Sequence, residues 1–341
     1  MKELIIFIGI TVIAYFWVDL IRTWLIKHQI FDLPNERSSH TIPTPRGGGL
    51  VVVAITLLVT LVVTILTKEW KVGGVFILTG FCVAWVGWTD DTKKLSSKLR
   101  FFFQGLIAVV TILGLGYFHS VTIPLIGEVQ LGYVGILITI LWIVGLMNAY
   151  NFMDGIDGMS GSVALTASLG WMLFLGINGQ FSSLLFWIAL AIAASSLGFL
   201  GHNWPPARIF LGDVASTFLG FSFAVLPLLS VDKVDNAFLL GVIVMWAYIL
   251  DTLITFIRRL IKGERVFSAH RSHVYQRLVI SGYQVSSITS LYLLFTSLGI
   301  VLAYAWIQSY RFAPAAIVIG LPIIWILLIL FTKYHENKAS H

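Results

Sequence analysis

The sequence predicts an all-α, polytopic integral membrane protein with about 10–11 transmembrane helices, in a single domain over residues 1–341. Of the 341 residues, 58% are hydrophobic and only 11% are charged. Apolar runs of about twenty residues, the length of helix that crosses a bilayer, recur along the whole chain. This composition excludes a soluble fold. No nucleic acid is expected as a partner despite the net charge of +6, because the basic residues lie next to the apolar runs.

The first apolar run begins directly after Glu3 and is too long for a cleavable signal peptide, so we expect it to remain as the first span. The single cysteine, Cys82, lies in another run and is expected to be a small buried apolar residue. With ends defined to within a few residues, we expect eleven spans, at residues 4–26, 48–67, 72–88, 101–118, 132–150, 161–178, 182–200, 213–230, 236–260, 285–307 and 312–332.

The basic residues predict the orientation in the membrane. If the loop after the first span is cytoplasmic, five of the 22 lysines and arginines lie on the opposite side, namely Lys2, Lys68, Lys71, Lys233 and Arg311. Cytoplasmic loops are enriched in lysine and arginine. The N-terminus is therefore expected outside and the C-terminus inside. We expect the short polar tail after Lys333 to be mobile.

A polar cluster closes the fifth apolar run. Asn148, Asn151, Asp154 and Asp157 recur every three residues, so on a helix they would lie along one face. Acids and amides at a bilayer boundary cost free energy unless they bind a metal, a phosphate or a sugar. We therefore take them as candidate ligand-binding residues. The alternative is a helix cap with a turn, because Asp and Asn are common capping residues.

Residues 32–49 form a second candidate segment on the same side. Prolines that prevent a helix and glycines that expose the backbone surround Arg37, His40 and Arg46. This loop is suited to cradle a phosphate or a sugar. The alternative is a plain linker, since Pro and Gly are common in turns.

Adjacent carboxylates, Asp90 and Asp91, follow the third apolar run. Their mutual repulsion must be offset by a cation, which either a metal ion or Lys94 could supply. The alternative is a solvated loop.

The segment from 202 to 213 places an amide, Asn203, an aromatic ring, Phe210, and a carboxylate, Asp213, close together on the inner side. Capping of the following span is an alternative role for Asp213. On the outer side, residues 121–131 alternate like a short hairpin to which we assign no chemistry.

The last inner segment is basic and rich in donors. His270, Arg271 and His273 suit a pyrophosphate better than zinc, because no thiol or third clustered histidine accompanies them. Asp251 lies inside an apolar run and is expected to be structural rather than catalytic. All the candidate clusters therefore lie on the cytoplasmic side, where a lipid headgroup and a soluble substrate can meet.

These motifs, in this order, resemble the polyprenyl-phosphate N-acetylhexosamine-1-phosphate transferases, the superfamily of the MraY and WecA types in glycosyltransferase family 4. The resemblance covers nearly the whole chain. It rests on Asp90-Asp91-Thr-Lys-Lys94, Asn148-x-x-Asn151-x-x-Asp154-Gly-x-Asp157-Gly, Phe210-Leu-Gly-Asp213-Val-Ala-Ser216 and the late basic loop.

The resemblance implies a bacterial inner-membrane enzyme that transfers a sugar 1-phosphate from a UDP-sugar to undecaprenyl or another polyprenyl phosphate and releases UMP. It implies Mg²⁺, with Mn²⁺ as an alternative, and leaves a homodimer open. Asp213 would be the metal ligand and a catalytic residue, and Asp90 and Asp91 the acidic pair near the lipid phosphate. Residues that match nucleotide-binding positions are Asp154, Asp157, Asn203 and Phe210, with Phe210 near the uracil. The other expected substrate-binding residues are Asn148, Asn151, Arg46, His270, Arg271 and His273.

Two departures from the family pattern bear on the sugar. Only His273 matches a histidine of the family's histidine-rich string, and Ala215 replaces the usual glycine after the metal-binding aspartate. The segment from 38 to 49 resembles the WbpL-like branch, which initiates O-antigen synthesis, more than the muramyl-pentapeptide branch. This favours a UDP-N-acetylhexosamine without a peptide.

Three alternatives remain. The first is a phospho-N-acetylmuramoyl-pentapeptide transferase, which differs in the UDP-sugar it consumes. The second is a secondary transporter, which predicts charges at the membrane midplane and repeated halves, whereas most acids here lie at span ends. The third, a purely structural scaffold, leaves the polar clusters unexplained. Within the transferase interpretation, the lipid phosphate attacks the UDP-sugar directly, or Asp90 attacks first.

Overall fold

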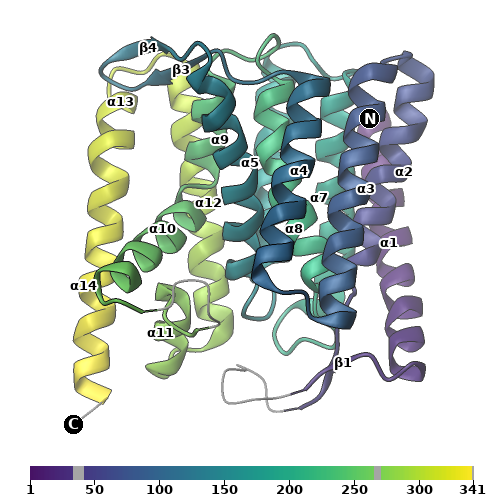
Figure 1. Ribbon diagram of the computed structural model, residues 1–341, viewed down its shortest axis with the longest axis vertical. Helices are drawn as coiled ribbons and strands as arrows, with labels where there is room; N and C mark the ends of the chain where they lie inside the picture. Colours follow the sequence, from purple (N-terminus) through teal and green to yellow (C-terminus); the bar gives the residue numbers. More distant parts are fainter. Residues whose placement is uncertain (34–41, 265–269, 340–341) are drawn as a thin grey trace.

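The computed structural model describes residues 1–33, 42–264 and 270–339. In chain order the elements are α1 (Lys2–Lys27), β1 (Phe31–Asp32), β2 (Thr44–Pro45), α2 (Leu50–Thr67), α3 (Trp70–Lys93), α4 (Ser97–Leu115), β3 (Ser120–Ile123), β4 (Gly127–Gln130), α5 (Val134–Met153), α6 (Met159–Ile177), α7 (Leu184–Asn203), α8 (Asp213–Leu229), α9 (Ala237–Val244), α10 (Trp246–Ile261), α11 (Val274–Ile280), α12 (Val285–Ile307), α13 (Ala313–Ala315), the π-helical turn η1 (Ala316–Gly320) and α14 (Leu321–Ala339). The all-α prediction is confirmed, and most helices run side by side along the long axis (Figure 1).

The expected spans are helical, but one of them is not straight. Nine helices in the described ranges are long and apolar enough to cross a membrane, and α8 is apolar but has only 17 residues. The segment predicted as a span over 236–260 is not one straight helix, because α9 and α10 meet at a bend of 71°. Met245, between them, departs from helical geometry with φ −96° and ψ 11°. The two helices together are long and apolar enough to count as one span, so length and mean hydropathy do not reveal the break.

Helix α8 lies at the centre of the bundle, and almost all its residues are buried. It packs against α3 and α5. Gly87 of α3 makes this approach possible, because a Cβ atom there would lie 2.5 Å from the carbonyl oxygen of Asp213 and 2.7 Å from the Cα atom of Val214. The end of α3 and the start of α8 are thereby brought into direct contact.

The two ends of the bundle differ in their connections. β3 and β4 pair antiparallel with Ser120 opposite Gln130, which confirms the hairpin predicted for residues 121–131. This hairpin and the N-terminus lie at the upper end in Figure 1, whereas β1, α11 and the C-terminus lie at the lower end. The termini are at opposite ends, as predicted. Which end faces the cytoplasm stays a prediction.

The tail after Lys333, which was expected to be mobile, is helical over its described part. Helix α14 continues to Ala339. Arg277 of α11 forms a two-armed ion pair with Glu336 of α14, in which Nε lies 2.6 Å from Oε1 and Nη2 contacts Oε2. Sequence reasoning found no apolar pattern in this tail and missed the charge pair, which connects residues 59 positions apart.

The contact at Gly87 yields a prediction about stability. Gly87→Ala should lower the free energy of unfolding by roughly 1–3 kcal/mol, because the added methyl group meets the rigid backbone of α8. Gly74→Ala is the matched control: it lies on the same helix with nothing within 4 Å of the added Cβ atom, and alanine favours helix. Thermal unfolding of the purified protein in detergent measures both. Equal melting temperatures for the two variants would contradict the close packing of α3 on α8.

Candidate active site

Three helix ends and one loop converge at the lower end of the bundle. The end of α3 carries Asp90 and Asp91, the end of α5 carries Asn151, and the start of α8 carries Asp213. Arg46 reaches them from the turn between β2 and α2. This turn is attached to the segment before α8 by backbone hydrogen bonds, among them that of the Phe210 amide to the Pro45 carbonyl at 2.8 Å.

Asp91 caps helix α8 although it belongs to α3. Its Oδ1 atom accepts a hydrogen bond from the Asp213 amide at 2.9 Å, and its Oδ2 atom accepts one from the Val214 amide at 3.0 Å. A carboxylate in this position satisfies free amides and faces the positive end of the helix dipole. Gly212, with φ +87°, leaves room for it, since a Cβ atom there would lie 2.8 Å from Oδ2 of Asp91. Asp213 need not cap its own helix, so its carboxylate is available for another contact.

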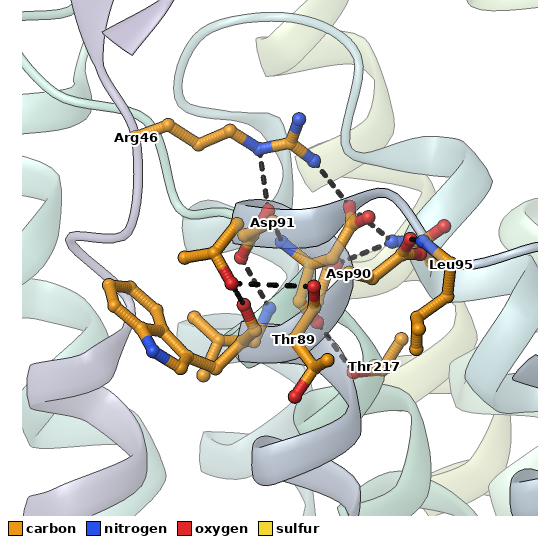
Figure 2. A network of polar contacts seen from close by, with 12 residues as sticks. Arg46, Thr89, Asp90, Asp91, Leu95 and Thr217 are labelled. Carbon is orange, nitrogen blue, oxygen red and sulfur yellow. Dashed lines mark hydrogen bonds and ion pairs between the residues drawn. The ribbon is translucent and has the colours of Figure 1, made fainter. Parts of the chain in front are cut away.

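Arg46 joins the two acids. Its Nε atom lies 2.8 Å from Oδ1 of Asp91, and its Nη2 atom lies 2.6 Å from Oδ1 of Asp213 (Figure 2). Burial alone would lower the pKa of Arg46, but attraction to Asp213 and then to Asp91 outweighs it and raises that pKa above its usual value. The guanidinium therefore stays charged. The Asn151 amide also donates to Oδ1 of Asp213, at 2.9 Å, and to the Ser216 hydroxyl, at 2.9 Å.

Asp90 has a separate set of partners. Its Oδ1 atom accepts from the Leu95 amide at 2.8 Å, and its Oδ2 atom pairs with Nη1 of Arg100 at 2.8 Å (Figure 2). Two arginines thus balance the adjacent acids, Arg100 for Asp90 and Arg46 for Asp91. The suggestion that Lys94 supplies this charge is wrong for the described structure, because Lys94 is exposed at the end of α3 and takes part in no ion pair there.

Asn148 lies behind Asp90 rather than beside Asp213. Its amide donates to Oε1 of Gln104 at 2.6 Å and to the Val144 carbonyl at 2.8 Å. Gln104, Asp90 and Arg100 line a cavity of about 10 Å³, close to the volume that one water molecule needs. Asn148 therefore connects α5 to α4, the helix whose Arg100 pairs with Asp90. The sequence did not single out Gln104 and Arg100 as residues that support Asp90.

The four residues of the central motif do not share one helix face, which corrects the prediction. Asn148 and Asn151 lie on α5, but the helix ends at Met153, and Asp154 and Asp157 follow in the turn before α6. The flexible glycines after Asp154 and Asp157 are the signal that favoured a turn there. Asp157 is used structurally: its Oδ2 atom accepts from the Ala207 amide at 2.9 Å.

The carboxyl group of Asp154 interacts electrostatically with Arg46, Asp91 and Asp213. Burial raises the pKa of its carboxyl group to about 7, the negative charges of Asp213 and Asp91 add to this effect, and Arg46 opposes it. A further positive charge in the cluster would favour the ionised form.

Asn203 connects two loops. Its Oδ1 atom accepts from the Gly158 amide at 3.0 Å, and its Nδ2 atom donates to the Ile209 carbonyl at 2.9 Å. Both polar groups of this side chain are therefore engaged with backbone. Phe210 is half-buried beside the Arg46 turn, where the two residues form an isolated parallel bridge.

The basic segment that contains His270, Arg271 and His273 lies beside Asp251 and forms a second cluster with it. Oδ1 of Asp251 accepts from the Val274 amide at 2.9 Å and lies 3.1 Å from Nδ1 of His273, and Oδ2 accepts from the Tyr292 hydroxyl at 2.5 Å. Asp251 thus has the structural contacts that were expected of it. His273 is buried and its Nε2 atom has no hydrogen-bond partner within the described ranges.

His270 lies next to this cluster, with its ring centroid 5.0 Å from that of His273 and its Nδ1 atom 2.9 Å from the Ser272 hydroxyl. Arg271, which lies between these two histidines in the sequence, is half-buried. The Tyr275 hydroxyl donates to the Phe152 carbonyl at 2.9 Å, which connects this cluster to the end of α5. Arg37 and His40, which were also expected to contribute, lie outside the described residues.

The chain is similar in sequence to a known family. The family described as Glycosyl transferase family 4 matches residues 74–231, the range that contains both acids of α3, the end of α5 and the start of α8.

Relatives extend the match over most of the chain. The "Probable undecaprenyl-phosphate N-acetylglucosaminyl 1-phosphate transferase" of Bacillus subtilis is 30% identical over 269 residues, 77% of this chain and 73% of the relative. The "Decaprenyl-phosphate N-acetylglucosaminephosphotransferase" of Mycobacterium leprae is 27% identical over 91% of this chain and 82% of the relative. A "Phospho-N-acetylmuramoyl-pentapeptide-transferase" of Chlamydia muridarum is 34% identical, but over only 54% of this chain and 60% of the relative. The chain therefore belongs to glycosyl transferase family 4, in the superfamily of polyprenyl-phosphate N-acetylhexosamine-1-phosphate transferases.

Proposed function

We propose that this protein transfers an N-acetylhexosamine 1-phosphate from a UDP-sugar to undecaprenyl or another polyprenyl phosphate and releases UMP. The observation that carries the proposal is the junction of Arg46, Asp91 and Asp213 at one end of a membrane bundle, in a chain whose relatives carry the names of such transferases. The reaction initiates a surface polysaccharide such as O-antigen. The site faces the cytoplasm at the inner membrane, which the basic loops support.

The residues at this junction fit a Mg²⁺ ion. Asp213 is partly exposed, with 19% of its side chain accessible, and carboxylate oxygens are the ligands that Mg²⁺ prefers. Within the described ranges no group of three or more His, Cys, Asp or Glu side chains could hold a metal ion together. Mg²⁺ commonly binds through one or two carboxylates with water and substrate phosphates, so Asp213 would hold it, and Mn²⁺ is an alternative. The ion would neutralise charge on the diphosphate.

The lipid phosphate and the diphosphate of the UDP-sugar are both anions and repel each other, and basic side chains of the protein can offset this repulsion. Arg46 presents a fixed positive charge beside Asp213, and His270, Arg271 and His273 supply donors for the diphosphate from the second cluster. The nucleotide lies along Asp154, Asp157, Asn203 and Phe210. Asn203 and Asp157 act there by holding the loops, since their side chains bond to backbone.

Asp90 acts on the lipid phosphate in this proposal. Both its oxygens already accept a hydrogen bond, from the Leu95 amide and from Arg100, so the carboxylate is held in one orientation. In the proposed scheme the lipid phosphate attacks the UDP-sugar directly and Asp90 keeps that phosphate deprotonated; a covalent intermediate on Asp90 is the alternative scheme.

The two main alternatives have less support. The match to the muramyl-pentapeptide transferase of Chlamydia muridarum covers about half of the chain, whereas the N-acetylglucosamine-1-phosphate transferases match over three quarters or more. A transporter has no counterpart among these relatives.

The metal assignment predicts that Asp213→Asn lowers transfer at least about 100-fold, because one oxygen of a hard ligand site becomes an amide nitrogen. UMP release by protein in detergent, with and without Mg²⁺, measures this, and an unchanged melting temperature shows that the variant is folded. Full activity in the presence of chelator, or in the variant, is incompatible with the assignment.

The role of Asp90 predicts a separate pattern. Asp90→Asn should lower turnover roughly 10²–10⁴-fold with little change in UDP-sugar affinity, the mark of a lost transition-state contact. Arg100→Gln should have a smaller effect in the same direction, partly restored by Arg100→Lys, because the acid remains but loses its partner. Lys98→Gln, exposed on the same helix as Arg100, is the control. Turnover rates together with calorimetric nucleotide binding test this, and a variant of Asp90 that turns over normally but binds UDP-sugar poorly would reassign Asp90 to the nucleotide.

The sugar is predicted to be a UDP-N-acetylhexosamine, either N-acetylglucosamine or a 6-deoxy relative such as N-acetylfucosamine. Protein incubated with undecaprenyl phosphate and a panel of UDP-sugars, followed by mass spectrometry of the lipid, identifies it. Product formed only from the muramyl-pentapeptide donor would move the protein to the other branch. A lipid product without a sugar-linked pyrophosphate would refute the proposed reaction itself.

A further inference from the structure

The carboxylate of Asp213 is held asymmetrically. Its Oδ1 atom accepts from Nη2 of Arg46 at 2.6 Å and from Nδ2 of Asn151 at 2.9 Å. Among the described residues, no hydrogen bond or ion pair reaches Oδ2. A carboxylate offers about four lone-pair positions, roughly two on each oxygen. Both positions on Oδ1 are therefore taken by protein donors, whereas those on Oδ2 face the partly exposed site.

The two donors are themselves fixed. Arg46 is anchored by its second contact to Asp91, at 2.8 Å, and Asp91 is anchored by the backbone amides of Asp213 and Val214. Asn151 is anchored by the Ser216 hydroxyl at 2.9 Å. Arg46, Asp91 and Asp213 form a closed ring of contacts, because Asp91 bonds both to Arg46 and to the amide of Asp213. The side chain of Asp213 cannot turn without breaking its two hydrogen bonds, to Arg46 and to Asn151.

We propose that Arg46 and Asn151 are positioning residues that restrict Asp213 to coordination through one oxygen, Oδ2, and thereby make the site select Mg²⁺ over Ca²⁺. This inference rests on the proposed function, in which Asp213 holds the cation. Mg²⁺ requires near-ideal octahedral geometry, whereas Ca²⁺ takes six to eight oxygen ligands and readily binds both oxygens of one carboxylate. A carboxylate that can offer only one oxygen denies Ca²⁺ a ligand that it would otherwise gain.

The two donors have different charges, so their removal has distinguishable effects. Asn151→Ala opens one lone-pair position on Oδ1 without changing the charge, and should raise the affinity for Ca²⁺ relative to Mg²⁺. Arg46→Ala opens the other position and also removes a positive charge, so it should strengthen binding of both ions while shifting the ratio in the same direction. Ser222→Ala is the matched control, because it removes a buried hydroxyl of the same helix, α8, that bonds to the Phe218 carbonyl and to neither donor on Asp213.

The experiment measures binding of each metal alone. The melting temperature of the purified full-length chain in detergent is followed during titration with MgCl₂ or CaCl₂, and the dissociation constants are obtained from the shifts. We expect the native chain to prefer Mg²⁺, and the Asn151 and Arg46 variants to shift the Mg²⁺-to-Ca²⁺ affinity ratio toward Ca²⁺ by about tenfold or more, the usual scale for residues that orient a metal ligand. Ser222→Ala should leave the ratio within about twofold of native, a range set by ordinary coupling of small core changes.

Two results would overturn the inference: a native chain without preference for Mg²⁺, or the same ratio in both variants as in the native chain. Because a general loss of stability changes both titrations alike, it does not move the ratio. Asp213→Asn separates this inference from the proposed function. If that variant binds Mg²⁺ as the native chain does, the metal assignment itself fails. If it loses Mg²⁺ while the ratio is constant in the other variants, the assignment stands and only the selectivity role is rejected.

Discussion

The site depends on one contact between helices, the carboxylate of Asp91 at the beginning of α8. Helix α8 starts at Asp213, between the buried residues Gly212 and Val214, and no side chain at its own start caps it. Asp91, from α3, supplies both hydrogen bonds. This arrangement leaves the side chain of Asp213 free to face the site and places a second acid within reach of Arg46. The close approach at Gly87 is what allows the two helices to meet in this way.

Charge balance explains why the acids can stand together at a membrane surface. Isolated carboxylates are costly to bury, but each acid of the pair on α3 has its own arginine, from a loop for Asp91 and from α4 for Asp90. The partners come from different elements, so the two acids are separated in function although they are adjacent in sequence. Asp91 shapes the start of α8, whereas Asp90 lines the small cavity together with Arg100 and Gln104.

The asparagines show what sequence reasoning could and could not resolve. Asn148, Asn151 and Asn203 all appeared as substrate-binding candidates, because each is an amide at the end of an apolar run. Only Asn151 contacts Asp213 directly. Asn148 bonds to Gln104 and Asn203 bonds to backbone, each holding a neighbouring element in place. The residue types correctly predicted which end of the bundle carries the polar side chains. The direction in which each side chain points, however, depends on where its helix ends.

The sequence by itself determined the membrane-spanning helical fold, the hairpin of β3 and β4 and the membership of the family, because hydropathy, alternation and motif order are local properties of the chain. It also located the candidate residues at one end of the bundle. Only the tertiary structure decided that Met245 breaks the ninth span, that the central motif leaves the helix at Met153, and that Arg46 and Arg100 rather than Lys94 neutralise the acids. These features depend on how helices cross and how closely their backbones approach, which involves residues far apart in the chain. Neither the composition nor the spacing of residues in the sequence gives the distances between such residues.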